Sequence, residues 1–433
     1  MKKLLMLVAA LVLGASLLSA GGNRQPGGGA GKTPLRIVTW TNPASVEAIK
    51  TLSAKFMVKY PDITVEVTDI ESNQVDGLLR TRMAANDVEI ISHQGGLTRA
   101  QVDWAPGEKP TWQEMIDAGN YLDITNEPWL KAWGSGVDSC RYNGKVYGVS
   151  VGSTVVTGVF YNKKLFAENG WQVPKTWAEF ERLCAAIKAK GIAPMTVGGA
   201  DGWPYTMLMN DTVASVEPDH DGLIRALWSG DRKFTDEKSL EIFRRGEFLN
   251  QNFEDGFKSI PYSAAPGRFV AGRAAMMPDG NWNVTEILKA DPNFQVGYFP
   301  LPGTEPGLQF QGKSDLSFHI NAKSSYKDGA LKWLEFLSDK ANYTEFINTI
   351  GFIPTMAGVT ISNKFLNEEI LPYVGNLKPL WELNWRAPSG VGQYAGYSAY
   401  QYLKSAGGPV TTVAELAQLA QKDFDDAKAA IKK

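Results

Sequence analysis

Cysteine and histidine are scarce in this sequence, and their scarcity narrows the chemistry that the protein can perform. Only two cysteines occur among 433 residues, Cys140 and Cys184, too few and too far apart for a disulfide scaffold or a zinc site. A single disulfide between them stays open. The three histidines, His93, His220 and His319, are scattered, and none belongs to an H-E-x-x-H arrangement. We therefore expect neither a bound metal nor a cofactor.

An excess of charge of either sign is also missing. The chain carries 44 Lys+Arg against 46 Asp+Glu, a formal net charge of -2. Because no basic cluster stands out, the sequence lacks the electrostatic footprint of a nucleic-acid-binding protein. The acidic segment E-P-D-H-D-G at 217–222 lacks the twelve-residue spacing of a calcium loop, so we interpret it as a solvated turn.

Long apolar runs are confined to the N-terminus. Two lysines precede an apolar run at 4–18 and small residues at 19–22, the pattern of a secretory signal peptide, and the run is shorter than the roughly 20 residues of a membrane span. We predict a signal peptide at 1–21 and export to the periplasm or the cell surface. Residues 18–20 match the start of a lipoprotein box, but its cysteine is replaced by Gly21. A soluble form and a lipoprotein whose native cysteine was replaced both stay open.

The next segment, 22–34, is rich in glycine and is predicted to be a flexible tether, because such a composition cannot bury apolar surface. Gly31-Lys32-Thr33 matches the end of a phosphate-binding loop. Pro26, however, stands where that loop needs its first glycine, and no strand precedes it. We therefore favour the tether.

The remaining chain is long enough for two lobes, since single cores stop growing at about 250–300 residues. Apolar patterning alternates strand 35–40, helix 46–60 and strand 63–67, and a helix and strand at 73–92 repeat the order. Such alternation indicates an α/β fold with a largely parallel sheet. Further helices are predicted by periodicity and by two capping boxes, at 176–190, 237–250, 326–339 and 413–432.

Gly148-Val149-Ser150-Val151-Gly152 has the spacing of a hydrolase nucleophile elbow. That elbow requires a sharp turn and an immediately following helix. The residues after Ser150 are β-branched and predict a strand instead, so we do not interpret Ser150 as a nucleophile. An exported hydrolase, such as a glycosidase that uses carboxylates and aromatic residues, is kept as the alternative.

Aromatic residues are plentiful, with 13 Trp and 15 Tyr. Several tryptophans stand beside Gly, Asn or Asp at the end of an apolar segment, where a loop leaves a sheet and where α/β proteins bind ligands. An indole stacked on a sugar ring, with polar groups around it, fits the usual composition of a ligand pocket. For each single tryptophan, a place in the core is the alternative.

Several segments together resemble the bacterial extracellular solute-binding proteins of sugar ABC transporters. The resemblance covers nearly the whole chain after the tether. Two features depart from it, namely Val151-Gly152 ahead of Ser153, and Gly21. The segments that carry it occur in the order of that family: YNGKVYG at 142–148, FYNKKLF at 160–166, PKTWAEF at 174–180, RFVAGRAAMMPDGNW at 268–282 and GFIPTMAGV at 351–359.

The resemblance implies an α/β, two-lobed periplasmic-binding-protein fold, each lobe a largely parallel sheet flanked by helices and built from discontinuous segments. Lobe 1 is expected at 35–151 and 312–355, and lobe 2 at 152–311 and 356–433, with hinge closure over the ligand. The implied function is the substrate-binding component of a carbohydrate ABC importer, which is no enzyme. Its partners are a mono- or oligosaccharide and membrane permease subunits, without nucleic acid, and we expect a monomer. A binding protein for a non-sugar solute is the second alternative.

The resemblance also implies which residues contact the ligand. Trp282 occupies the position of a family stacking aromatic and is the leading candidate. Arg386 has the geometry for paired hydrogen bonds to adjacent hydroxyls or to a carboxylate, and Ser153 is expected to donate at the floor of the cleft. The other candidates are His93, Gln94, Trp40, Asn42, Glu47, Asp201, Trp203, Asn281, Lys313, Asp315 and Trp385.

Overall fold

A computed structural model describes residues 33–71, 74–93, 100–107, 109–307, 310–374, 378–379 and 387–431. The predicted signal peptide and most of the predicted tether lie outside these residues. Among the helices that the structure describes, none combines the length and the hydropathy needed to cross a bilayer.

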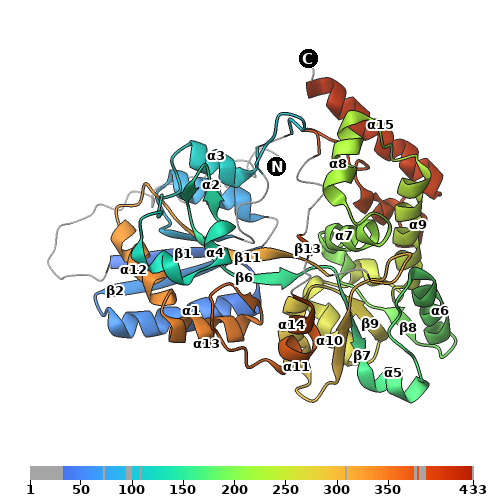
Figure 1. Ribbon diagram of the computed structural model, residues 1–433, viewed down its shortest axis with the longest axis horizontal. Coiled ribbons are helices and arrows are strands. Elements are labelled where there is room, and N and C mark those ends of the chain that lie inside the picture. Colours follow the sequence, from blue (N-terminus) through green and yellow to red (C-terminus); the bar gives the residue numbers. More distant parts are fainter. Residues whose placement is uncertain are drawn as a thin grey trace, which may run out of the picture.

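In the described part of the chain, one sheet has the strand order β12-β6-β11-β3-β1-β2, with β13 beside β11. We call this sheet and the helices around it lobe 1. Its helices lie above and below the strands in Figure 1. The strands are β1 Thr33–Trp40, β2 Ile63–Ile70, β3 Ile90–His93, β6 Val149–Val155, β11 Gln311–Ile320, β12 Ile353–Pro354 and β13 Lys378–Pro379. The helices are α1 Pro43–Lys59, α2 Val75–Ala84, α3 Thr111–Asp117, α4 Ser135–Asp138, α12 Lys327–Leu337 and α13 Lys340–Ile350.

A second sheet has the order β10-β7-β9-β8 and forms lobe 2 with the helices around it (Figure 1). Its strands are β7 Val159–Asn162, β8 Ala193–Met195, β9 Ala274–Pro278 and β10 Val296–Phe299. Its helices are α5 Lys163–Asn169, α6 Trp177–Lys188, α7 Pro204–Val216, α8 His220–Ser229, α9 Glu237–Asn252, α10 Ala265–Val270, α11 Val284–Ala290, α14 Leu371–Val374 and α15 Val413–Ile431. A separate hairpin joins β4 Arg141–Tyr142 to β5 Lys145–Val146.

The fold is α/β as predicted, but the sheets are mixed rather than largely parallel. In lobe 1, β1, β2 and β3 form a parallel set and β13 is parallel to β11, whereas β11 is antiparallel to β3 and β6, and β12 is antiparallel to β6. In lobe 2, β8 and β9 are parallel, whereas β7 is antiparallel to both of its neighbours. The reason is the path of the chain, because β6 leads from the first sheet to the second and β11 returns in the opposite direction.

Side-chain caps explain where several helices begin. Thr176 and Glu179 form the predicted capping box of α6, since the Thr176 hydroxyl accepts from the Glu179 N–H at 3.3 Å. The box before α15 has the same bond, from the Glu415 N–H to the Thr412 hydroxyl at 3.1 Å. In the acidic segment at 217–222, Asp219 caps α8 by accepting from the Gly222 N–H at 2.9 Å. These caps satisfy N–H groups that the helix itself leaves unpaired.

Each lobe has an apolar core. Trp133, Trp333 and Phe56 are buried in the core of lobe 1. In lobe 2, the apolar face of α6 packs into the core, and Cys184 on that face is only 1% exposed. Both cysteines are buried, and no disulfide joins them.

The strand directions turn both sheets toward one zone. In lobe 1, β3 runs toward the start of β11, because Ile90 pairs with Ile320 and His93 pairs with Ser317. The start of β11 lies beside the end of β6. In lobe 2, Pro278 at the end of β9 pairs with Val159 at the start of β7. The carboxyl ends of β1, β3, β8 and β9 therefore all face the region where the chain passes from one lobe to the other, after β6 and before β11. Ligands of α/β sheets bind at the carboxyl ends of the strands.

Candidate functional site

A cluster of polar and aromatic side chains lies at the carboxyl end of β9. The Tyr262 hydroxyl donates to Asp279 Oδ1 at 3.0 Å and accepts from Trp282 Nε1 at 2.6 Å and Asn283 Nδ2 at 2.7 Å. Asn283 Nδ2 also contacts Asp279 Oδ2 at 2.7 Å. Trp282 is half-buried and packs against both apolar clusters of the protein, the first of which includes its lobe 2 neighbours Met277 and Val284. The network therefore fixes the indole of Trp282 at the carboxyl end of β9.

Two residues from the loop after β8 join this cluster. The Trp203 ring meets the Tyr262 ring edge-on, with centroids 4.3 Å apart, and Trp203 is 38% exposed. Asp201 Oδ2 accepts from the Tyr262 N–H at 2.6 Å. Three of the predicted ligand contacts, Trp282, Trp203 and Asp201, are thus brought together around Tyr262.

The electrostatics of the cluster are set by burial. Desolvation raises the pKa of the Asp279 carboxyl to about 7, although hydrogen bonds from Gly280, Tyr262 and Asn283 favour its ionised form. Burial and the charge of Asp279 raise the pKa of Tyr262 well above its ordinary value. Tyr262 therefore keeps its proton and remains the donor to Asp279. Burial and the same charge also raise the pKa of Asp211 on α7.

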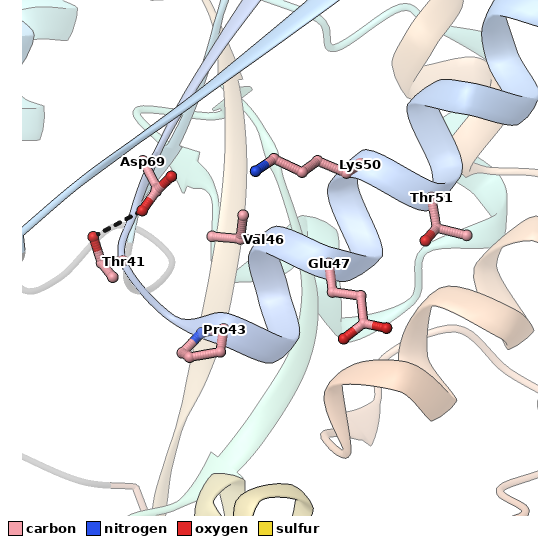
Figure 2. Close-up of a pocket in the computed structure, with 7 residues that line it drawn as sticks. All are labelled: Thr41, Pro43, Val46, Glu47, Lys50, Thr51 and Asp69. Atoms are coloured by element: carbon pink, nitrogen blue, oxygen red, sulfur yellow. Dashed lines mark hydrogen bonds between the residues drawn. The ribbon is translucent and has the colours of Figure 1, made fainter. Parts of the chain in front are cut away.

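In lobe 1, a pocket of about 460 Å³ lies where β1 and β2 end and α1 begins. Figure 2 shows Thr41 and Asp69 joined by a hydrogen bond, with Glu47 and Lys50 projecting from α1 in different directions. The hydroxyl of Thr41 donates to Asp69 Oδ2 at 3.1 Å. Carboxylate, ammonium and hydroxyl groups that are open to solvent can pair with the hydroxyls of a ligand. The pocket is lined by Thr41, Pro43, Val46, Glu47, Lys50, Thr51 and Asp69.

The three predicted contacts after the first strand have different places. Glu47 lines the pocket. Asn42 begins α1, and its Oδ1 accepts from the Ser45 N–H at 3.0 Å, so this oxygen serves as the helix cap. Trp40, the last residue of β1, is 8% exposed and belongs to the core of lobe 1, which is the alternative weighed for single tryptophans.

Predicted contacts also lie on β6 and β11, the strands that lead from lobe 1 to lobe 2 and back. Ser153 on β6 pairs with Ser314 of β11, and Lys313 pairs with Thr154. The Thr154 hydroxyl donates to Asp315 Oδ2 at 3.1 Å, and Asp315 is only 7% exposed. The crossing strands thus gather Ser153, Lys313 and Asp315 within a short stretch beside the junction of the lobes.

Asn281, the neighbour of Trp282, has 0% exposure. Its Oδ1 accepts from the Val155 N–H at 2.7 Å, and its Nδ2 donates to the Gly351 carbonyl at 3.3 Å. Both ends of its amide are therefore bonded to the backbone.

Three predicted contacts, Gln94, Trp385 and Arg386, lie outside the described residues. His93 is described only as the last residue of β3, opposite Ser317.

Ser150 lies inside a strand rather than at a turn. It is 0% exposed, and its hydroxyl donates to the Asp315 carbonyl at 2.9 Å. Strand β6 continues to Val155, and the next element is strand β7. The prediction of a strand after Ser150 is confirmed, and the turn and helix of a nucleophile elbow do not occur here.

Sequence reasoning missed Tyr262, Asp279 and Asn283. Asp279 and Asn283 directly precede and follow the Gly-Asn-Trp segment, so their nearness to Trp282 in the sequence could have marked them as candidates. Tyr262 lies in no motif, and only the folded chain places its hydroxyl between Trp282 and Asp279.

Comparison with known proteins establishes the family. Residues 51–372 match the bacterial extracellular solute-binding proteins. This match covers more than half of the 433 residues, and the chain belongs to that family.

Individual relatives are more distant. The chain is similar to the multiple sugar-binding protein of Streptococcus mutans, with 27% identity over 318 residues that cover 72% of each protein. It is 31% identical over 209 residues to GgtB of Synechocystis, an osmoprotective compounds-binding protein, which covers 44% of this chain and 48% of the relative. Among solved structures, SBP RafE in complex with raffinose has a TM-score of 0.75 at 22% identity, covering 92% of this chain and 100% of the other. That likeness concerns the fold.

Proposed function

We propose that this protein is the substrate-binding component of a carbohydrate ABC importer. It captures a mono- or oligosaccharide between its lobes and delivers the sugar, as an exported monomer, to membrane permease subunits. The observation that carries the proposal is the cluster of Trp203, Tyr262 and Trp282 at the carboxyl ends of β8 and β9. Aromatic walls with a few aimed polar groups are the usual composition of a small-molecule site.

The lobe 2 cluster suits a sugar because it combines flat apolar faces with hydrogen-bonding groups. A sugar ring has an apolar face that stacks on an indole, and the hydroxyls at its rim need donors and acceptors. Asp201 is exposed beside Trp203 and supplies acceptor oxygens there. The multiple sugar-binding relative and the raffinose-bound neighbour support sugar as the ligand class.

Lobe 1 contributes the opposite wall. Glu47 and Lys50 in the pocket at the start of α1 provide an acceptor and a donor for hydroxyls, and Lys313 and Ser153 lie on the strands between the lobes. The lobes close over the sugar by a hinge at these strands. A ligand drives such closure only by binding the closed form more tightly than the open form.

We infer that lobe 1 comprises 35–151 and 312–355 and that lobe 2 comprises 152–311 and 356–433. The separate sheets support this division except at β13, whose residues 378–379 pair with β11 in the sheet of lobe 1. Glu369 also supports it, because this residue of the last segment bonds to Lys163 and to the Tyr298 N–H, both in lobe 2. The first boundary falls inside β6, as expected for a strand that leads from one lobe to the other.

The protein binds its ligand without converting it. Ser150 is buried and donates to a backbone carbonyl, and the relatives are named as binding proteins. The family, described as extracellular, supports export.

A thermal-shift screen tests the ligand class. Raffinose and other mono- and oligosaccharides form one arm, and glycine betaine, an osmoprotectant without a sugar ring, forms the other. At a concentration 100 times its dissociation constant, a ligand stabilises the protein by about 2.7 kcal/mol, so a sugar that binds should raise the melting temperature by several degrees. If glycine betaine gives the only shift, the similarity to GgtB identifies the ligand class instead and the sugar proposal is wrong. Release of smaller sugars during incubation would contradict the binding function itself.

A further inference from the structure

Asn281 joins the two lobes through the backbone. It lies in the short helical turn Asn281–Asn283, which follows strand β9 in lobe 2. Its Oδ1 accepts from the N–H of Val155, the last residue of β6. Its Nδ2 donates to the carbonyl of Gly351, which follows α13 in lobe 1. Its side chain has 0% exposure. One amide thus connects lobe 2 with two segments that enter or leave lobe 1.

The position of the amide follows from the register of β6 and β12. Ile353 pairs with Ser153, and Pro354 pairs with Gly152, in antiparallel orientation. Continuing that register places Gly351 opposite Val155. In an antiparallel ladder, every second pair of opposite residues exchanges both of its N–H and C=O bonds, and Val155 opposite Gly351 lies two positions from Ser153 opposite Ile353. The Asn281 amide supplies an acceptor to Val155 and a donor to Gly351 where the ladder has ended, and so it takes the place of the missing backbone pair.

The packing around Gly351 leaves little room for relative movement. Gly351 has a φ of 70°, the left-handed conformation that glycine adopts without strain. A Cβ at this position would come within 3.2 Å of Thr285 Cγ2, so the start of α11 lies directly against the end of α13. The end of α13 is therefore held against lobe 2 at two points, by the start of α11 and by the Asn281 amide.

We propose that Asn281 is a positioning residue that couples the place of Trp282 to the strands at which the lobes move. Asn281 holds the crossing segments, and the adjacent Trp282 is held by Tyr262. The inference rests on the proposed function in assigning Trp282 to the ligand. Asn281 then contributes to binding without touching the sugar, because it keeps the stacking ring oriented before the ligand arrives.

Interlobe distances test this coupling. Spin labels are attached at Val58→Cys on α1 and Val173→Cys before α6, since these side chains are 84% and 38% exposed and the native cysteines are buried. Distances are measured by pulsed electron resonance without and with raffinose. Asn281→Ala removes both hydrogen bonds, whereas Asn281→Asp retains the acceptor, removes the donor to Gly351 and keeps the size of the side chain.

The matched control is Asn250→Ala. Asn250 is 3% exposed, donates to the Tyr400 carbonyl and accepts from the Tyr205 hydroxyl, all within lobe 2. All variants should lose thermal stability. Only the Asn281 variants should broaden the ligand-free distance distribution and weaken raffinose binding by about tenfold, the factor that corresponds to 1.4 kcal/mol.

Two results separate the possible failures. If the Asn281 variants keep the parent distances and the parent affinity and lose only stability, as Asn250→Ala should, the coupling is overturned. If the parent protein binds no sugar, the proposed function fails, and the ligand-free distances still decide whether Asn281 holds the lobes. Should Asn281→Ala not fold, Asn281→Asp gives the same comparison.

Discussion

The Tyr262 hydroxyl connects three side chains that lie close together only in the folded protein. It donates to Asp279 and accepts from Trp282 and Asn283, so its hydrogen-bonding capacity is fully used. Asp279 is only 2% exposed and holds this hydroxyl in place. The residue-scale consequence is a stacking surface whose orientation depends on a buried carboxyl group.

The buried carboxyl of Asp279 makes stability depend on pH. Its pKa rises from 3.8 to about 7 on folding, so between these values the folded protein retains a proton that the unfolded chain releases. The protonated Asp279 therefore contributes to the free energy of unfolding. This contribution, up to about 4 kcal/mol, is fully present below about pH 4 and is lost as the pH rises through about 7. Chemical denaturation across this range should show the decline.

Asp279→Asn is the matching variant, because it cannot titrate. The decline between about pH 4 and 7 should become shallower but should persist in part, since the pKa of Asp211 is raised in the same direction. An unchanged slope in Asp279→Asn would show that another group controls the pH dependence.

Among the elements, the helices were easier to predict than the direction of the strands. Capping boxes and apolar periodicity are local signals, and α6 and α15 begin at the residues that these signals indicate. The direction of β7 and β11 depends on how the chain passes between the lobes, which no local pattern encodes. For the same reason, Trp282 could be found from its segment, whereas Tyr262 and the buried state of Trp40 could not.

Helix α1 provides a prediction at this scale. Asn42 Oδ1 caps the helix by accepting from the Ser45 N–H, so Asn42→Ala should lower the free energy of unfolding by about 1 kcal/mol. Chemical denaturation measures the loss, and Thr176→Ala, which removes the cap of α6, is the control with a similar expected loss. A fall in sugar affinity without a loss of stability in Asn42→Ala would assign Asn42 to the ligand rather than to the helix.

At the scale of the whole molecule, the strand directions and the side chains agree on one zone. The carboxyl ends of β8 and β9 carry the aromatic cluster, the ends of β1 and β2 carry the pocket of lobe 1, and β6 and β11 run through the sheet of lobe 1 to the side that faces lobe 2 (Figure 1). Membership of the solute-binding family and this arrangement lead to the same account, in which a ligand is enclosed where the lobes meet.

Calorimetric titration of Trp282→Ala with the sugar that gives the largest thermal shift tests this account most directly. Trp228→Ala is the control, since Trp228 is also a half-buried tryptophan of lobe 2 but packs against Phe424 of α15. Loss of a stacking ring and its buried area should weaken binding by at least about 2 kcal/mol, or roughly 30-fold. We expect this loss in Trp282→Ala and parent affinity in Trp228→Ala. Parent affinity in Trp282→Ala would contradict it.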